Sequence, residues 1–213
     1  AKDYGVPQNR PRVLIVGFRG DVFSTTNPSD DAIECGFLPK STGNAPDLVD
    51  VLDDLVDPNF TYGGETIFYP CDPRSSFQHE MRTTMDGALL IKGDLLTEQE
   101  YSNHKDYIQV KFQSMIDNNG VIPDQFKTKK FAQRLLPKYW GEKGPTITAT
   151  SLPDDFVHFS QARVPTVREW ARLQTFPDWY QFSGCRTTGG LRRAGNPREG
   201  LFDRELPRYT QIG

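Results

Sequence analysis

The chain has 213 residues, with 25 Lys and Arg against 28 Asp and Glu, and a formal net charge of −3. This length suits one large domain or two small ones and is ample for a buried core. No apolar run approaches the roughly 18 residues that a membrane span needs, and we expect no signal peptide at Ala1. The three cysteines are scattered and odd in number, which argues against a disulfide framework or a CxxC zinc site and favours a reduced, cytosolic protein.

The small net charge hides a segregation of charge along the chain. Residues 1–20 carry a net charge of +3, residues 21–60 carry −8, residues 61–160 carry −2 and residues 161–213 carry +4. Six basic side chains and one acidic side chain fall within residues 125–145. A basic segment contacts phosphate where its side chains share a face, and otherwise such a run merely solvates the surface. Composition leaves both interpretations open.

The N-terminal part of the chain predicts one strand, one loop and one helix. The β-branched run Arg12–Phe18, bounded by proline and glycine, is typical of a strand buried on both faces. Residues 23–46 are rich in Ser, Thr, Asn, Asp, Pro and Gly and predict a loop. Apolar residues then recur at helical spacing over Leu48–Val56, which predicts an amphipathic helix with an acidic outer face.

The middle of the chain predicts short strands and a further helix. Strand-like pieces lie at Thr66–Tyr69, Ala88–Ile91 and Tyr107–Phe112, each between turn signals. Helical spacing returns over Phe126–Leu136, where a proline ends it. The alternating residues 145–150 predict another strand.

The strongest local signal lies between residues 165 and 177. Thr166 and Glu169 form a capping-box pattern, in which each side chain satisfies a free amide of the first helical turn. The apolar residues that follow form one buried stripe, and Pro177 forbids continuation of the helix. Residues 183–208 are rich in Gly, Arg and Pro and predict a long loop.

Two arginines stand at alternate positions where the chain approaches the first predicted strand, in the sequence Gln8-Asn-Arg10-Pro-Arg12. Alternate side chains of a strand point the same way. A guanidinium so placed is costly to bury unless it makes paired hydrogen bonds to carboxylates, phosphates or carbonyl oxygens. A structural ion pair at the end of a sheet explains the pattern as well as a binding role does.

Three segments, in order along the chain, resemble motifs of one family. The run from Tyr4 to Gly17, which contains Gln8, Arg10 and Arg12, resembles the Gln-x-Arg-x-Arg motif of the DNA cytosine-5 methyltransferases. Arg163–Asp178 resembles their penultimate motif, and Tyr209–Gly213 resembles the opening of their last motif. The family's glycine-containing cofactor motif, Pro-Cys nucleophile and Glu-Asn-Val motif all precede these segments. The resemblance therefore implies the C-terminal portion of such an enzyme.

Pro70-Cys71 imitates the nucleophile dipeptide of that family. It follows the Gln-x-Arg-x-Arg motif instead of preceding it, and it lacks the family's glycines. We therefore interpret Cys71 as a small buried or loop thiol and not as the nucleophile. The spacing of the three histidines supports no metal site.

The resemblance implies an α/β fold in two parts. Residues 1–20 and 163–213 would belong to a Rossmann-like methyltransferase domain that is incomplete in this chain. Residues 21–162 would form a smaller, mixed α+β target-recognition domain. An incomplete sheet exposes an edge, so self-association of the chain is expected. The link over residues 183–208 is longer than the family usually has.

The resemblance also implies the chemistry of the complete enzyme, of the restriction–modification type. Such an enzyme flips a cytosine out of duplex DNA, attacks its ring with a thiolate and transfers methyl from S-adenosylmethionine to C5. By motif position, Arg12 would hold the cytosine carbonyl oxygen, Arg10 would serve the adjoining active-site network, and Gln8 would organise the turn. The expected partners are double-stranded DNA and the missing N-terminal catalytic part. Alone, the chain is expected to be inactive and not to bind S-adenosylmethionine tightly.

The expected DNA contacts lie in the middle of the chain. Three basic residues share one face of the predicted helix and would position phosphates, and threonines of the predicted strand would touch bases or sugars. These candidates are Lys127, Lys130, Arg134, Thr146, Thr148 and Thr150. Each one also suits an ordinary surface or strand face. Four residues of the penultimate motif are expected to be structural: Arg163, Thr166, Glu169 and Arg172.

Two other hypotheses are open. In one, the chain is a stand-alone DNA-binding specificity module that works with a separate catalytic chain. In the other, it is an RNA-directed relative of the same family. The absent motifs, if found upstream in the same reading frame, exclude the first, and competition between tRNA and duplex DNA decides the second.

Overall fold

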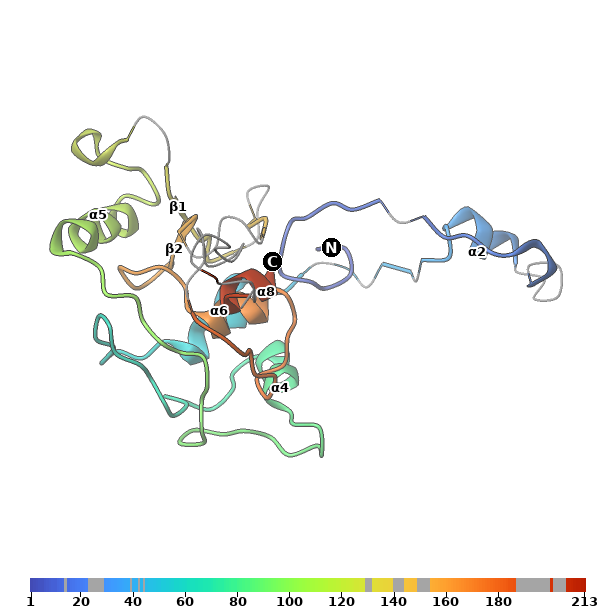
Figure 1. The fold of residues 1–213 in the computed structure, drawn as a ribbon, viewed down its shortest axis with the longest axis horizontal. Coiled ribbons are helices and arrows are strands. Elements are labelled where there is room, and N and C mark those ends of the chain that lie inside the picture. The colour runs from blue at the N-terminus through green and yellow to red at the C-terminus, as the bar shows by residue number, and fades with distance from the viewer. Residues whose placement is uncertain are drawn as a thin grey trace.

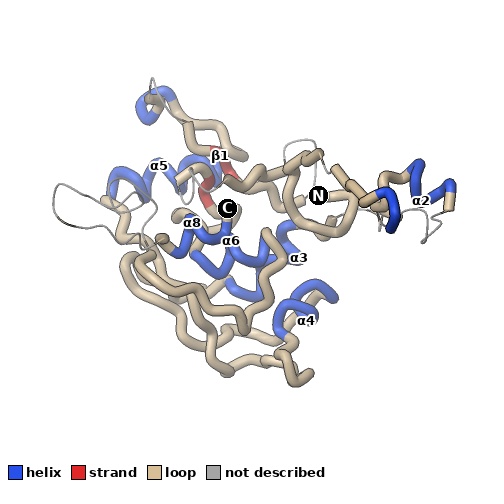
Figure 2. The backbone as a smooth tube through the Cα atoms, turned by 45° about the vertical axis from the view of Figure 1, so that its right-hand side comes forward, coloured by secondary structure: helices blue, strands red, loops and turns tan. Residues whose placement is uncertain are grey.

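The computed structural model describes residues 1–13, 15–22, 29–38, 40–41, 43, 45–128, 132–139, 144–148, 154–186, 200 and 206–213. These residues form a body of mixed α/β class from which a long arm projects (Figure 1). The elements are α2 (Asp30–Glu34) in the arm, and in the body α3 (Leu48–Leu52), the 3-10 helix η1 (Asp53–Leu55), α4 (Ser76–Arg82), α5 (Asp106–Asp117), the 3-10 helix η2 (Asp124–Phe126), β1 (Arg134–Leu135), β2 (Phe156–Val157), α6 (Val167–Leu173) and α8 (Arg208–Ile212). Loops make up most of the path between them (Figure 2).

Helix α6 lies at the centre of the main apolar core. All of its residues are buried, and it packs against α3 and α8. The cluster around it draws side chains from Leu48 in α3 to Ile212 in α8. A second, smaller cluster joins Phe112 and Met115 of α5 to Val157 of β2. Segments that are far apart in the sequence therefore share one body.

The capping box predicted for this helix is confirmed. The backbone N–H of Glu169 donates to the Thr166 hydroxyl over 3.1 Å, and the backbone N–H of Thr166 donates to the Glu169 carboxylate over 2.9 Å. The helix ends at its C-cap Gln174, and Thr175 adopts a left-handed backbone with φ of 61°. Pro177 follows, so the helix stops where its sequence predicts.

The helix predicted over Leu48–Val56 is also confirmed, as α3 continued by η1. Its leucines and Val51 are buried against the core. The acidic outer face is only partly as predicted, because Asp54 is completely buried. A carboxylate at that depth needs partners, and these come from α4 and α6.

The strand predicted over Arg12–Phe18 is wrong for the residues described. They pair with no other strand in the described part of the chain, and Val13 is 89% and Ile15 93% exposed. A strand buried on both faces needs neighbours at both edges and a layer on each face. No described residue supplies these neighbouring strands or covering layers. The apolar run instead lies in the arm.

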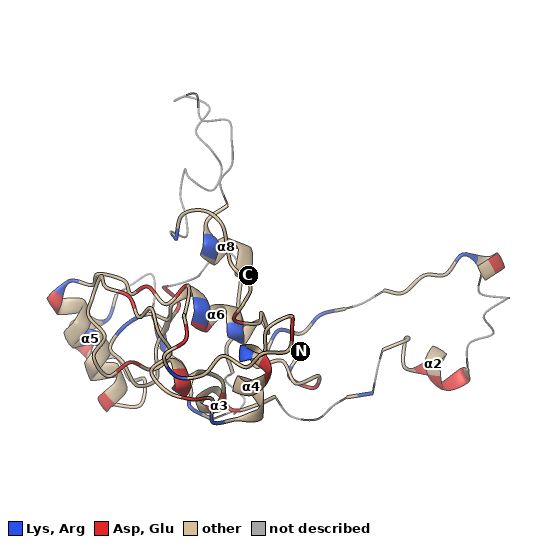
Figure 3. Cartoon of the chain, turned by 90° about the horizontal axis from the view of Figure 1, so that it is seen from below, with Lys and Arg blue, Asp and Glu red and all other residues tan. Residues whose placement is uncertain are grey.

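The arm runs out along residues 15–22 and returns along residues 29–38, with α2 near its far end (Figure 3). The rings of Phe18 and Phe37 join its two sides, with centroids 4.7 Å apart. The loop predicted over residues 23–46 thus contains a short helix, capped by the Ser29 hydroxyl. Part of that loop lies outside the described residues.

The strand predicted at Tyr107–Phe112 is wrong, because this segment belongs to α5. Ile108, Phe112 and Met115 recur four and three residues apart, and this helical spacing places them together in the second cluster. The helix predicted over Phe126–Leu136 is also wrong. Its start belongs to η2 and its end to β1, while residues 129–131 lie outside the described part. Pairing with β2, which lies far along the chain, overrides the local helical pattern.

The remaining strand predictions correspond to isolated bridges or to no strand. Strands β1 and β2 pair in parallel, with Arg134 opposite Phe156. Single bridges join Phe68 to Leu95 and Thr83 to Leu89, within the segments predicted as strands near 66–69 and 88–91. Residues 145–148 form no strand, and residues 149–150 lie outside the described part. The mixed α/β class itself is confirmed.

Candidate nucleic-acid interface and its buried support

The Gln-x-Arg-x-Arg segment is attached to the body at two points. The buried side chain of Gln8 donates from its amide nitrogen to Oε1 of Gln174, the C-cap of α6. The backbone N–H of Asn9 donates to the carbonyl of Pro145 over 2.7 Å. The Thr146 hydroxyl donates to the carbonyl of Asn9, also over 2.7 Å. Two elements far along the chain thus hold residues 8 and 9.

The two arginines of this segment are not committed to carboxylates. Nε of Arg10 is buried and has no hydrogen-bond partner, and Arg12 is exposed with one contact, from Nη1 to the carbonyl of Pro11 over 3.0 Å. Within the described part of the chain, neither forms a salt bridge. An uncompensated guanidinium favours a phosphate, carboxylate or carbonyl oxygen as its ligand.

A buried charge network joins three helical segments of the body. Asp54 of η1 contacts Arg82 of α4 over 2.6 Å and Arg172 of α6 over 2.5 Å. Arg172 also contacts Asp178 over 2.6 Å, and the Tyr69 hydroxyl donates to Asp178 over 2.6 Å. The side chains of all four ionic members are fully buried. Each charge is paired, which is the condition for burying it at acceptable cost.

The pKa values in this network follow from the pairing. Burial acts to lower the pKa of Arg172, but Asp178 and Asp54 raise it well above its usual range. Burial acts to raise the pKa of Asp178, but Arg172 and hydrogen bonds lower it. Burial and the adjacent Asp178 charge raise the pKa of Tyr69. Asp178 and Arg172 therefore stay ionised, and the Tyr69 phenol stays neutral.

A second network surrounds the N-terminus of α6. Arg163 binds the Glu169 carboxylate with both Nη atoms, over 2.6 and 2.8 Å, and its Nε donates to Oε1 of Gln161 over 2.9 Å. Burial acts to raise the pKa of Glu169, but Arg163 lowers it to about 2. His158 lies 3.8 Å from Glu169, yet burial lowers its pKa to about 3. His158 is therefore neutral, and this contact is not a salt bridge.

The residues predicted to contact phosphates do not share a helical face. Lys127 is exposed and forms an ion pair with Asp124 over 2.6 Å. Arg134 lies on β1, is exposed to solvent, and has its guanidinium 4.2 Å from the centre of the Phe156 ring. Lys130 lies outside the described residues. The prediction that these cations share one helical face is therefore wrong, although Lys127 and Arg134 are both exposed to solvent.

The three threonines predicted to contact bases or sugars also lie in different surroundings. Thr146 is exposed, but its hydroxyl proton is used in the bond to Asn9. Thr148 is half-buried, and Thr150 lies outside the described residues. Thr146 therefore connects the Gln-x-Arg-x-Arg segment to the body through its side chain.

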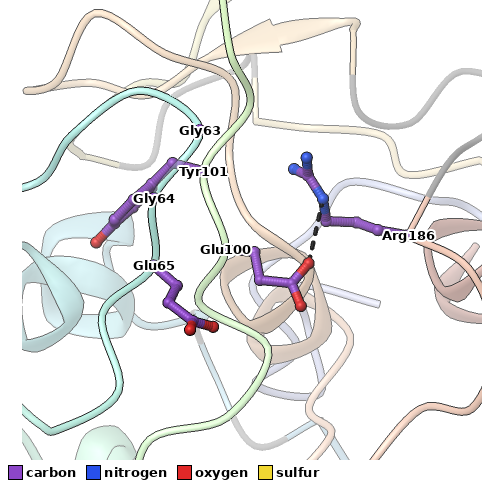
Figure 4. Close-up of a pocket in the computed structure, with 6 residues that line it drawn as sticks. All are labelled: Gly63, Gly64, Glu65, Glu100, Tyr101 and Arg186. Carbon is purple, nitrogen blue, oxygen red and sulfur yellow. Dashed lines mark ion pairs between the residues drawn. The ribbon is translucent and has the colours of Figure 1, made fainter.

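One cavity of about 270 Å³ opens between the loops near residues 63 and 100. Its lining is Gly63, Gly64, Glu65, Glu100, Tyr101 and Arg186. Glu100 pairs with Arg186 over 3.3 Å, as Figure 4 shows. Two carboxylates against one guanidinium make this wall unsuited to phosphate. A second cavity, of about 490 Å³ and lined in part by Ile116, Leu136 and Phe159, is more apolar.

The described residues show no metal centre, and the Cys71 thiol is poorly suited to act as a nucleophile. None of their His, Cys, Asp and Glu side chains form a group of three or more that is placed to hold a metal ion. Cys71 is half-buried, and its thiol faces the carbonyl of Asp54 over 3.7 Å. Burial raises the pKa of Cys71, which disfavours the thiolate that a nucleophile requires. In the same part of the chain, no helix is long and apolar enough to cross a membrane.

The sequence alone did not predict three residues of the charge network and of the contact to Gln8, namely Asp54, Arg82 and Gln174. Asp54 lies between Val51 and Leu55 on the buried stripe of its helix, and a charged residue in an apolar stripe signals a buried partner. Arg82 in α4 and Gln174 at the end of α6 gave no comparable signal. Their partners are supplied by segments distant in sequence.

Comparison with known proteins identifies the family. Residues 1–197 match the family described as C-5 cytosine-specific DNA methylase, and the chain belongs to this family. The resemblance seen in the three motifs is thereby confirmed at the level of the family.

Curated relatives are bacterial and plant enzymes. Over its whole length the chain is 29% identical to the type II methyltransferase M.DdeI of Desulfomicrobium norvegicum, of which it covers 48%. It is 28% identical over its whole length to the type II methyltransferase M.BspRI of Lysinibacillus sphaericus, of which it covers 38%. An alignment over 69 residues, which covers 30% of the chain and 8% of DNA (cytosine-5)-methyltransferase 3 of Zea mays, is 48% identical. The chain thus spans about half or less of the length of these relatives.

Proposed function

We propose that this chain is the target-recognition and cytosine-pocket part of a DNA cytosine-5 methyltransferase of the restriction–modification type. The observation that carries the proposal is the pair of uncommitted arginines, Arg10 and Arg12, on a turn attached to the body. The membership of the family and the type II relatives support it. The complete enzyme would transfer methyl to C5 of cytosine in duplex DNA.

In this proposal each residue of the motif has a separate task. The target base leaves the stack, because its ring carbons are out of reach within a duplex. Arg12, whose guanidinium is exposed, would donate to the cytosine carbonyl oxygen and stabilise charge that develops there. Arg10, whose Nε lacks a partner, would bind the adjoining backbone and active-site groups. Gln8 would hold the turn.

The methyl donor implied by the family is S-adenosylmethionine, and the described residues do not fit it by themselves. A nucleoside cofactor of this kind needs a glycine-rich turn at the carboxyl end of a parallel sheet. The parallel pairing described here has two residues in each strand, and the nine residues that join β2 to the next helix, α6, contain no glycine. We therefore assign tight binding of the donor to the other part of the complete enzyme.

We further propose that residues 1–20 and 163–213 complete a Rossmann-like catalytic domain and that residues 21–162 recognise the target. The charge network supports a rigid connection between the two, since Arg172 binds Asp54 from across the proposed boundary. The rest of the catalytic domain would correspond to the half of the relatives that this chain does not span. The exposed Val13 and Ile15 would enter its sheet, and in its absence would favour self-association.

Contact with DNA would combine phosphate positioning and base recognition. The exposed Lys127 and Arg134, with Lys130, would bind phosphates, and Thr148 and Thr150 would approach bases or sugars. A protein that binds DNA in this way would act in the cytoplasm. The described cysteines are free thiols, as a reducing compartment requires.

A methyl-transfer assay tests this function. The chain alone and the complete enzyme are incubated with labelled S-adenosylmethionine and duplex DNA. We expect incorporation of label only by the complete enzyme, and bisulfite mapping of the product then gives the recognition sequence. Label incorporated by the chain alone contradicts the assignment of the donor site, and an inactive complete enzyme contradicts the function.

A second candidate is a stand-alone specificity module that works with a separate catalytic chain. The reading frame distinguishes the two. Nucleophile and cofactor motifs upstream in the same frame exclude the module, whereas their presence in a neighbouring gene supports it.

A further inference from the structure

Gln174 is placed to orient the Gln-x-Arg-x-Arg segment. It is the C-cap of α6, and its Oε1 accepts a hydrogen bond from the amide nitrogen of Gln8. Gln8 is 5% exposed, and its own Oε1 is buried without a partner. Among the described residues, the bond to Gln174 is therefore the one side-chain hydrogen bond that Gln8 makes.

The end of α6 is a rigid support for such a contact. Arg172, two residues before Gln174, is fully buried and binds both Asp54 and Asp178. Thr175, one residue after it, has a positive φ that fixes the exit of the chain. The backbone of Gln174, between Arg172 and Thr175, is therefore held in place, and its side chain offers Gln8 a fixed acceptor.

We propose that Gln174 is a positioning residue for methyl transfer. It holds Gln8, and through the backbone of residues 8–12 it sets the direction of the guanidiniums of Arg10 and Arg12. This inference rests on the proposed function and gives the penultimate-motif helix a role beyond support of the recognition domain. A misplacement of catalytic groups by about 1 Å lowers rates by orders of magnitude, so a contact of this kind affects the chemical step.

The first test is Gln174→Met in the complete enzyme, because methionine has a similar length and is only a weak acceptor. We expect kcat to fall about tenfold or more, with KM for duplex DNA within about twofold and the melting temperature lowered by no more than about 4 °C. The matched control is Gln113→Met. Gln113 is exposed on α5 and bonds to Asp117 of its own helix over 2.9 Å, so its replacement should leave kcat unchanged.

A double-mutant cycle distinguishes positioning from general weakening. If Gln174 acts through Gln8, then Gln8→Met combined with Gln174→Met lowers kcat no further than Gln8→Met alone. Additive losses overturn the proposal, as does an unchanged kcat in Gln174→Met while the wild-type enzyme methylates DNA. If Gln174→Met does not fold, Gln174→Asn keeps the amide but withdraws it by one methylene, and the same fall in kcat is expected.

A measurement on the isolated chain separates this inference from the proposed function. In a ¹H–¹⁵N spectrum, the side-chain amide of Gln8 should shift in Gln174→Met and stay unchanged in Gln113→Met. An unaffected Gln8 signal overturns the inference, whatever the enzyme does. A complete wild-type enzyme that fails to methylate cytosine instead overturns the proposed function, and the positioning role falls with it.

Discussion

The replacement Asp54→Asn tests the buried charge network directly. Asp54 is fully buried and neutralises two guanidiniums, accepting from Arg82 over 2.6 and 2.8 Å and from Arg172 over 2.5 and 3.0 Å. Asparagine has nearly the same shape but carries no charge. Arg172 keeps Asp178, whereas Arg82 keeps the carbonyl oxygens of Cys71 and of residue 54 itself, and the ring of Tyr69, whose centre lies 3.8 Å from its guanidinium. The substitution therefore leaves one buried guanidinium without a carboxylate.

The expected loss follows from the cost of an unpaired buried charge. Removing one partner of a buried ion pair typically costs about 3–5 kcal/mol. A domain of this size has about 5–15 kcal/mol of stability in total, so the variant should be much less stable and close to unfolding at 37 °C. In urea, the midpoint should fall by about 1–2 M, measured by far-UV circular dichroism of the isolated chain.

The matched control is Asp50→Asn, which makes the same change on the exposed face of α3. We expect it to alter the free energy of unfolding by no more than about 0.5 kcal/mol. Adding Arg82→Met to Asp54→Asn should recover part of the loss, because it removes the uncompensated charge. The reasoning is refuted if Asp54→Asn is no more destabilising than Asp50→Asn, or if the second substitution makes the loss larger.

Three further predictions concern pH, catalysis and DNA affinity. Arg163 lowers the pKa of Glu169 from 4.5 to about 2, so the ionised carboxylate stabilises the fold by about 3 kcal/mol above pH 4.5. This stabilisation is lost as the pH falls toward 2. An acid titration in which Glu169→Gln keeps the wild-type dependence of stability on pH contradicts this prediction. Arg12→Ala should preserve duplex binding yet abolish methylation by the complete enzyme, and residual turnover near the wild-type rate refutes its role. Lys127→Glu with Arg134→Glu should weaken binding to every DNA sequence alike and reduce the salt dependence in a filter-binding assay, whereas unchanged affinity excludes this surface.

The local sequence predicted those elements whose signals lie within a few residues. The capping box of Thr166 and Glu169 is satisfied by hydrogen bonds between neighbours, so the pattern is sufficient to place α6. The helix over Leu48–Val56 follows equally from spacing and flanking prolines. Where the pattern was weaker, as at Tyr107–Phe112, a short apolar run suits strand and helix alike.

The candidate site was predictable as a set of residues but not as an arrangement. Motif order identified Gln8, Arg10 and Arg12, since a motif is read from residue identity alone. It did not show that Gln174 and Thr146 hold the turn, because those contacts join segments 166 and 137 residues apart. The predicted helical face of Lys127 and Arg134 failed for the same reason, since the partner of β1 lies some twenty residues further along the chain.

By itself, the sequence determined the family, the two capped or bounded helices and the segregation of charge, because each depends on residue identity or on neighbours within one or two turns. Only the tertiary structure decided that Asp54 is internal and that Arg172 reaches it across 118 residues. It also decided that the apolar run at Ile15 lies exposed on an arm. Burial depends on which distant segments pack together, and no local pattern encodes that choice.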